Sequence, residues 1–139
     1  MKKLIDWLNP RGTKTWLLIL GIVLGGAWGV AFLALVDYLI QRYPKQITGV
    51  DTTLMLGIFV GIATLSFFLA ILSKDKRGMT YGLYAGLACM VACGLILYRN
   101  SLTLVPLVGI MGPLGAFNGA GLGEMFNRSR EARKKERDL

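Results

Sequence analysis

Residues 16–40 read WLLILGIVLGGAWGVAFLALVDYLI, an apolar run of 25 residues whose one charge, Asp37, lies near its end. A transmembrane helix needs about 20 predominantly apolar residues to cross roughly 30 Å of hydrocarbon. The apolar region of a cleaved signal peptide is shorter, about 7–15 residues. We therefore interpret this run as a membrane-spanning helix that is retained in the protein.

Three further apolar runs follow, over residues 54–72, 79–98 and 102–123. The whole chain of 139 residues is 54% apolar and only 17% charged, whereas soluble domains carry about 25% charged residues. Four such helices would leave almost no polar face to meet water. The sequence predicts an all-α integral membrane protein with four transmembrane helices in a compact, glycine-packed bundle.

The distribution of Lys and Arg predicts the orientation of these helices, because cytoplasmic loops carry an excess of both residues. Four lie before the first span, three between the second and third, and six after the fourth, while the other side receives three. Both termini are therefore expected in the cytoplasm. The predicted segments are 1–15 (N-terminal segment with a short interfacial helix), 16–40 (first span), 41–53 (outer loop), 54–72 (second span), 73–78 (basic cytoplasmic loop), 79–98 (third span), 99–101 (tight outer turn), 102–123 (fourth span) and 124–139 (charged cytoplasmic tail).

Every predicted span carries glycines at intervals of four residues. Lipid tails are as apolar as leucine, so helices in a membrane associate through close packing at small residues rather than through hydrophobicity. The candidate packing residues are Gly21, Gly25 and Gly29; Gly57 and Gly61; Gly82 and Gly86; and Gly115, Gly119 and Gly123. Together they predict tight contacts between the helices.

Three polar residues within or at the ends of the spans are candidate functional sites, because polar groups in hydrocarbon are costly and usually functional. Asp37 is expected to pair with Arg42 or Arg99, and Glu124 with Arg128. Asn118 lies inside the hydrocarbon, where it requires a partner, which we expect on another helix. The fourth span also contains Gly112-Pro113 near its midpoint, which predicts a kink because proline removes a backbone hydrogen bond.

The chain contains no histidine, which excludes His-ligated haem, His metal sites and Ser-His-Asp or Cys-His catalysis. The sequence also lacks paired carboxylates or a nucleophile with a base, so we expect no enzyme activity, no cofactor and no metal. Cys89 and Cys93, four residues apart on one helix, are interpreted as small packing residues because parallel side chains on one helix are poorly placed for a disulfide.

Three functions fit this pattern. The first is an accessory, assembly or regulatory subunit of a larger membrane complex, for example one of bioenergetics; its partners are a membrane protein or a second copy. The second is a homo-oligomeric channel or small transporter whose path is lined by the fourth span. The third is a holin-like pore. Membrane lipid is the expected partner of the basic tail, since a short basic run beside a membrane contacts headgroups more often than nucleic acid.

Overall fold

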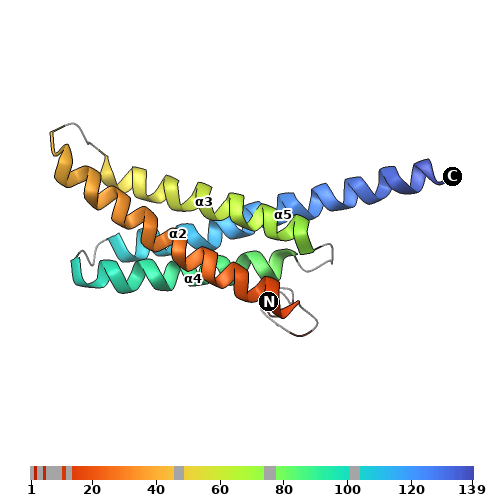
Figure 1. The fold of residues 1–139 in the computed structure, drawn as a ribbon, viewed down its shortest axis with the longest axis horizontal. Helices are drawn as coiled ribbons and strands as arrows, with labels where there is room; N and C mark the ends of the chain where they lie inside the picture. Colours follow the sequence, from red (N-terminus) through yellow and green to blue (C-terminus); the bar gives the residue numbers. More distant parts are fainter. Residues whose placement is uncertain are drawn as a thin grey trace.

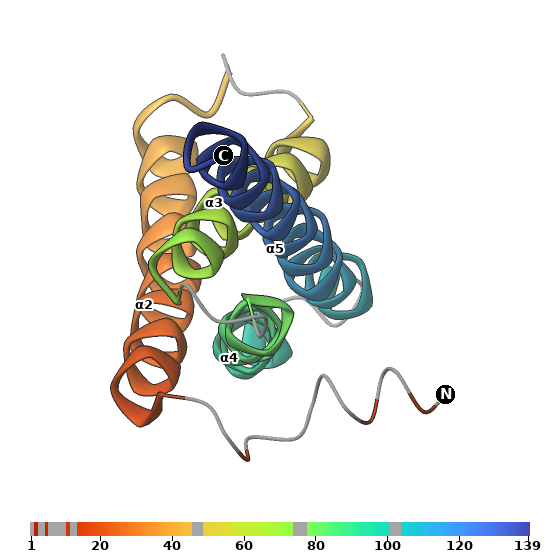
Figure 2. The ribbon, with the colours of Figure 1, turned by 90° about the vertical axis from the view of Figure 1, so that its right-hand side faces the viewer.

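The computed structural model describes residues 2, 5, 11, 14–45, 49–73, 78–100 and 104–139. Within these residues the chain forms four long helices: α2 (Thr15–Arg42), α3 (Val50–Ser73), α4 (Gly78–Asn100) and α5 (Leu104–Arg137). The helices lie side by side, and α5 continues beyond the other three at one end (Figures 1 and 2). The all-helical class predicted from the sequence is confirmed.

Three of the described helices are long and apolar enough to cross a membrane: Thr15–Arg42, Thr52–Ser73 and Gly78–Arg99. Their ends lie within a few residues of the predicted first three spans. The interfacial helix predicted in residues 1–15 falls, apart from Lys2 and Ile5, outside the described residues, as do residues 74–77 of the basic loop and residue 101 of the outer turn.

Two segments that the sequence predicts as separate form one continuous helix. The predicted fourth span, 102–123, and the predicted tail, 124–139, belong to one helix of 34 residues that contains Pro113 in its interior. At 1.5 Å per residue such a helix is about 50 Å long, well beyond the roughly 30 Å of a hydrocarbon core. The charged end of the chain is therefore a rigid continuation of the bundle.

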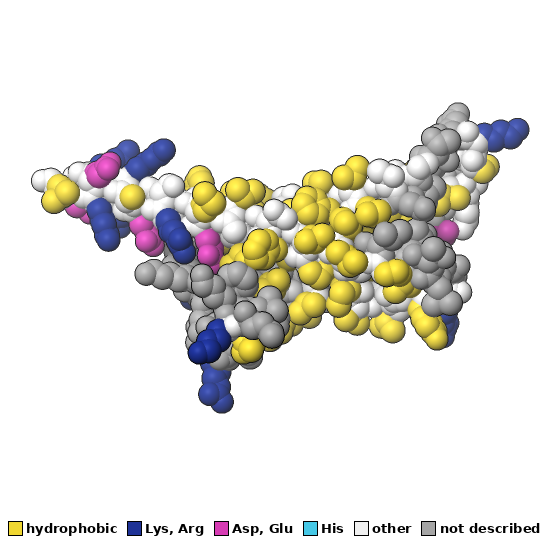
Figure 3. All heavy atoms as spheres, turned by 180° about the vertical axis from the view of Figure 1, so that it is seen from behind, with side chains coloured by type: hydrophobic (Ala, Val, Ile, Leu, Met, Phe, Trp, Pro, Cys, Tyr) yellow, Lys and Arg dark blue, Asp and Glu magenta, His cyan; other side chains and the backbone are white. Residues whose placement is uncertain are grey.

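Large apolar side chains cover the outside of the bundle. Val23, Val60, Leu95 and Leu122 each expose more than half of their surface, and they come from all four helices. Figure 3 shows apolar side chains over the middle of the molecule and most Lys and Arg side chains at its ends. A soluble protein rarely exposes an apolar surface of this extent, whereas a lipid-facing surface requires one.

The parallel helices α2 and α4 approach closely at glycines. A methyl group placed on Gly21 would lie 3.4 Å from the Tyr81 carbonyl oxygen, and one on Gly25 would lie 2.9 Å from the Ala85 carbonyl carbon. One turn further, Gly29 faces the sulfur atoms of Cys89 and Cys93. The contacts of Gly21, Gly25 and Gly29 move along α2 and α4 in the same direction, one turn at a time. The two helices therefore pack in parallel over this whole interface.

The helices α3 and α5 form a second parallel interface of the same kind. Gly115 faces the Phe59 carbonyl oxygen, Gly119 the Ala63 carbonyl and Gly123 the Phe67 carbonyl, with a Cβ-to-oxygen distance of 2.5 Å at Gly115 and 2.8 Å at Gly123. No side chain fits between these two backbones.

An antiparallel contact between α4 and α5 joins the two pairs. A methyl group on Gly82 would lie 2.8 Å from the Ala120 Cβ, and one on Gly86 would lie 2.8 Å from the Ala116 Cβ and from the Gly112 carbonyl oxygen. Two further glycines of α3 receive aromatic rings of α2: Gly57 faces Phe32 and Gly61 faces Trp28. All ten candidate packing glycines thus lie against another helix in this structure.

Gly25 and its neighbour Gly26 provide a matched test of this packing. We expect Gly25→Ala to destabilise the protein by about 1–3 kcal/mol, because the added methyl overpacks the contact with Ala85. A methyl group on Gly26 would have no atom within 4 Å, and alanine favours the helix, so Gly26→Ala should be neutral or stabilising. Thermal unfolding in detergent, followed by a thiol-reactive dye that reaches the buried Cys89 and Cys93 only after unfolding, measures both.

Equal unfolding midpoints for the two variants would contradict the close approach of α2 and α4.

Candidate functional site

A cluster of polar groups connects all four helices at the end of the bundle where α3 ends and α4 begins. We call it the polar cluster; its members are Lys14, Ser73, Tyr81, Glu124 and Asn127, with backbone groups of Ala70 and Met79. Helix ends leave backbone N–H and C=O groups without partners inside the helix. The side chains of the polar cluster satisfy such groups at two helix ends.

Glu124 serves the start of α4. Its Oε1 accepts a hydrogen bond of 3.0 Å from the backbone N–H of Met79, the second residue of that helix. Glu124 is half-buried, and its carboxylate also complements the positive N-terminal end of the helix dipole. The sequence predicts a pair of Glu124 with Arg128, and in the structure the carboxylate of Glu124 has its partner on another helix.

The end of α3 receives donors from two other elements of the chain and from α3 itself. The Ala70 carbonyl oxygen accepts hydrogen bonds of 2.8 Å from Asn127 Nδ2 and from Ser73 Oγ. Lys14 Nζ donates to the Ser73 carbonyl oxygen at 3.1 Å, which places a cation at the negative end of the α3 dipole. The backbone N–H of Lys14 donates to the hydroxyl of the fully buried Tyr81 at 2.6 Å.

The two other candidate polar residues do not join this cluster. Asp37 is exposed and accepts a hydrogen bond of 2.9 Å from Gln41 Nε2 on its own helix, rather than an ion pair with Arg42 or Arg99. Asn118 is also exposed, and its Nδ2 donates to the Leu114 carbonyl oxygen at 2.8 Å.

The sequence predicts a partner for Asn118 on another helix, and the one partner that the structure shows lies on its own helix. A short polar side chain in a helix can bond to the carbonyl four residues earlier, so it needs no neighbouring helix to satisfy one of its donors. Thr64 does the same through the Val60 carbonyl oxygen at 2.8 Å. Asp37, Asn118 and Glu124 therefore do not converge on one site.

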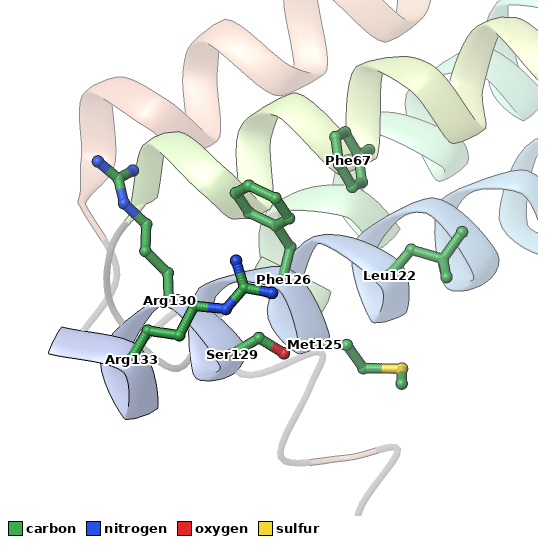
Figure 4. Close-up of a pocket in the computed structure, with 7 residues that line it drawn as sticks. All are labelled: Phe67, Leu122, Met125, Phe126, Ser129, Arg130 and Arg133. Carbon is green, nitrogen blue, oxygen red and sulfur yellow. The ribbon is translucent and has the colours of Figure 1, made fainter. Parts of the chain in front are cut away.

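Two of the surface hollows in the described part of the chain are lined by aromatic rings. One, of about 570 Å³, lies between α2 and α3 beside Trp28 and Phe32, whose rings stack with centroids 5.6 Å apart. The other, of about 600 Å³, is lined by Phe67 of α3 and by Leu122, Met125, Phe126, Ser129, Arg130 and Arg133 of α5 (Figure 4). We call the second hollow the arginine pocket.

The described residues include no group of three or more Cys, Asp or Glu side chains arranged to hold a metal ion. Cys89 and Cys93 are buried, with their sulfur atoms 3.9 Å apart on consecutive turns. The fully buried Ser66 hydroxyl lies in the contact of α3 with Gly82, and it has no hydrogen-bond partner among the residues that the structure describes.

Comparison of the chain with models of protein families, with curated proteins and with solved structures finds no match.

Of the polar cluster, Glu124 was predicted from the sequence as a candidate site residue, and the other members were not. Lys14, Tyr81 and Asn127 lie near the ends of apolar runs, where Lys, Tyr and Asn ordinarily meet water and headgroups. One feature of the sequence could have indicated them: they lie beside predicted helix ends, whose backbone N–H and C=O groups need hydrogen-bond partners. The pairing itself depends on the register of the helices, which no single segment contains.

Glu124 provides a test of the polar cluster. Glu124→Ala should lower the free energy of unfolding by about 1 kcal/mol, as loss of a helix-capping acceptor does. Glu124→Gln keeps an acceptor oxygen and removes only the charge, so it should cost less. The exposed Glu131 supplies the control, and Glu131→Ala should leave the unfolding midpoint in detergent unchanged.

If Glu124→Ala had the same unfolding midpoint as the Glu131→Ala control, the hydrogen bond to Met79 would contribute nothing to stability.

Proposed function

We propose that this protein is a small multi-pass membrane protein with four spans and both termini in the cytoplasm, and that it acts as an accessory or assembly subunit of a larger membrane complex. The three apolar helices support insertion in a membrane. The asymmetric distribution of Lys and Arg supports the orientation. The parallel register of α3 and α5 supports a fourth span, since residues 115–123 of α5 run beside residues 59–67 of an apolar helix.

The observation that carries the functional proposal is the projecting end of α5. From Arg128 to Leu139 every residue is exposed, and this segment, which we call the projection, extends past the rest of the bundle (Figure 1). It carries six basic and three acidic residues. A rigid cationic helix fixed to a membrane bundle is suited to docking on an acidic surface of a partner, because complementary charge guides and orients association.

A subunit that docks also needs a surface that its own helices leave open. Gly26, Gly94 and Gly121 lie in three different helices, and a methyl group on any of them would meet no atom within 4 Å. These glycines do not serve the internal packing of the bundle. They leave room for the close approach of a helix from a partner.

The topology can be tested by single cysteines, because the two native cysteines are buried. We expect a membrane-impermeant maleimide to label Lys45→Cys in intact cells, and to label Lys2→Cys and Leu139→Cys only after lysis. Labelling of Leu139→Cys alone in intact cells would mean that α5 does not span the membrane. Labelling of both terminal cysteines would reverse the proposed orientation.

The docking role can be tested by extracting a tagged chain in mild detergent, sizing it on a native gel and identifying the proteins that comigrate. We expect the native chain to migrate with a large complex and the double variant Lys134→Glu, Lys135→Glu to be released from it, since the reversal removes attraction to an acidic partner. The control, Glu131→Gln with Glu136→Gln, keeps every cation and should stay bound.

Retention of the charge-reversed variant in the complex would exclude the projection as the docking element. Migration of the native chain as a discrete oligomer of itself would contradict the accessory role and favour a channel, in which the exposed Asn118 would face another copy.

A further inference from the structure

The arginine pocket combines two chemically different halves. One half consists of Phe67, Leu122, Met125 and Phe126, which offer an apolar surface. The other half consists of Ser129, Arg130 and Arg133, which offer a hydroxyl and two guanidinium groups. At 1.5 Å per residue, Leu122 and Arg133 lie about 16 Å apart along α5. The pocket therefore changes from apolar to cationic along the helix axis.

The walls of the pocket are fixed by the packing of α3 against α5. The Phe67 and Phe126 rings meet edge to face with centroids 6.2 Å apart. In the adjoining contact between the two helices, Gly123 faces the Phe67 carbonyl oxygen, and Asn127 donates to the Ala70 carbonyl oxygen. The apolar half is thus built by two helices held in register.

Among the residues that the structure describes, no carboxylate lines the cationic half. Glu131 lines the neighbouring hollow, together with Ile71, Asn127, Lys134 and Arg130, and does not line the arginine pocket. Arg130 thus borders both hollows, whereas Arg133 lines the arginine pocket and not its neighbour. In Figure 4 the Arg133 side chain runs back along α5 toward Phe126, while Arg130 extends away from the helix on another side. A guanidinium group binds a phosphate through two parallel N–H donors, and the Ser129 hydroxyl is a further donor at the same level.

We infer that the arginine pocket binds one anionic phospholipid, with an acyl chain on Phe67, Leu122 and Met125 and the headgroup phosphate at Arg133 and Ser129. The charge of Arg130 lies at the border of the pocket and adds to the attraction. This inference rests on the proposed membrane insertion, which places the end of α3 at the cytoplasmic headgroup level. The order of the two halves agrees with that placement, because the apolar half lies within the bundle and the cationic half belongs to the first turns of the projection. A lipid with net negative charge is favoured because, among the described residues, two arginines and no carboxylate line the pocket.

Native mass spectrometry of the full chain in detergent tests the site, with added dioleoyl-phosphatidylglycerol or dioleoyl-phosphatidylcholine as probes. We expect one phosphatidylglycerol per chain to be retained, with an affinity at least about tenfold above that of phosphatidylcholine, the difference typical of a charge-assisted contact. Arg130→Gln with Arg133→Gln should remove this preference. The control, Lys134→Gln with Lys135→Gln, removes equal charge next to the pocket and should keep it.

Three results would overturn the inference. Equal affinity for the two lipids would show that the pocket does not distinguish an anionic lipid from a neutral one. An equal loss of the preference for phosphatidylglycerol in both double variants would show that the lipid is attracted by the overall charge of the projection. Displacement of the lipid by glycerol phosphate at equal concentration would show a site for a free phosphate, without a role for the apolar half. The thiol-dye melting assay checks that each variant is folded.

The lipid site and the proposed topology fail in different experiments. Binding in detergent micelles does not depend on which way the chain is inserted in a membrane, whereas cysteine labelling in cells does not depend on lipid selectivity. The docking variants change Lys134 and Lys135, which lie outside the arginine pocket, so loss of a partner protein is also separable from loss of the lipid.

Discussion

Backbone contact at glycine is the constraint on which the bundle depends. Helices in a membrane gain little by covering one another's leucines, so dispersion forces between closely packed surfaces must hold them together. Gly25 and Gly119 bring the backbone of one helix against the Ala85 and Ala63 carbonyls of another. Such contacts act over a short distance only. A methyl group at either position separates the helices and forfeits part of the attraction along the whole interface.

The polar cluster is a consequence of the same register. With Gly119 against Ala63 in parallel helices, two further turns along α5 bring Asn127 to the Ala70 carbonyl. With Gly82 against Ala120 in antiparallel helices, Glu124 comes to the N–H of Met79. The helix ends are therefore satisfied by side chains that the glycine contacts have already positioned. Because the helix backbones are already fixed, forming these hydrogen bonds requires little further loss of conformational entropy.

Single segments of the sequence predicted the helices but not their pairing. The length of the apolar runs indicated the class of fold, and the four-residue spacing of glycines marked the faces that pack. Nothing within residues 102–123 indicates that Gly115 meets Phe59, because a contact between helices depends on both partners. The same limit explains Asn118: its need for a partner was evident, and only the structure shows that Leu114 of its own helix supplies it. Arg133 belongs to a run of charges, and its place in one pocket with Phe67 required the continuity of α5.

That continuity explains why the charged end of the chain has a defined shape. An isolated charged helix of about ten residues is marginal in water, because nucleation is unfavourable and few bonds follow it. Here the nucleus is already formed by residues that Gly115, Gly119 and Gly123 hold against α3. The projection then grows from this fixed base. The position of Arg133 in the arginine pocket and the direction of the projection are thus both set inside the bundle, by the glycine contacts that precede them on α5.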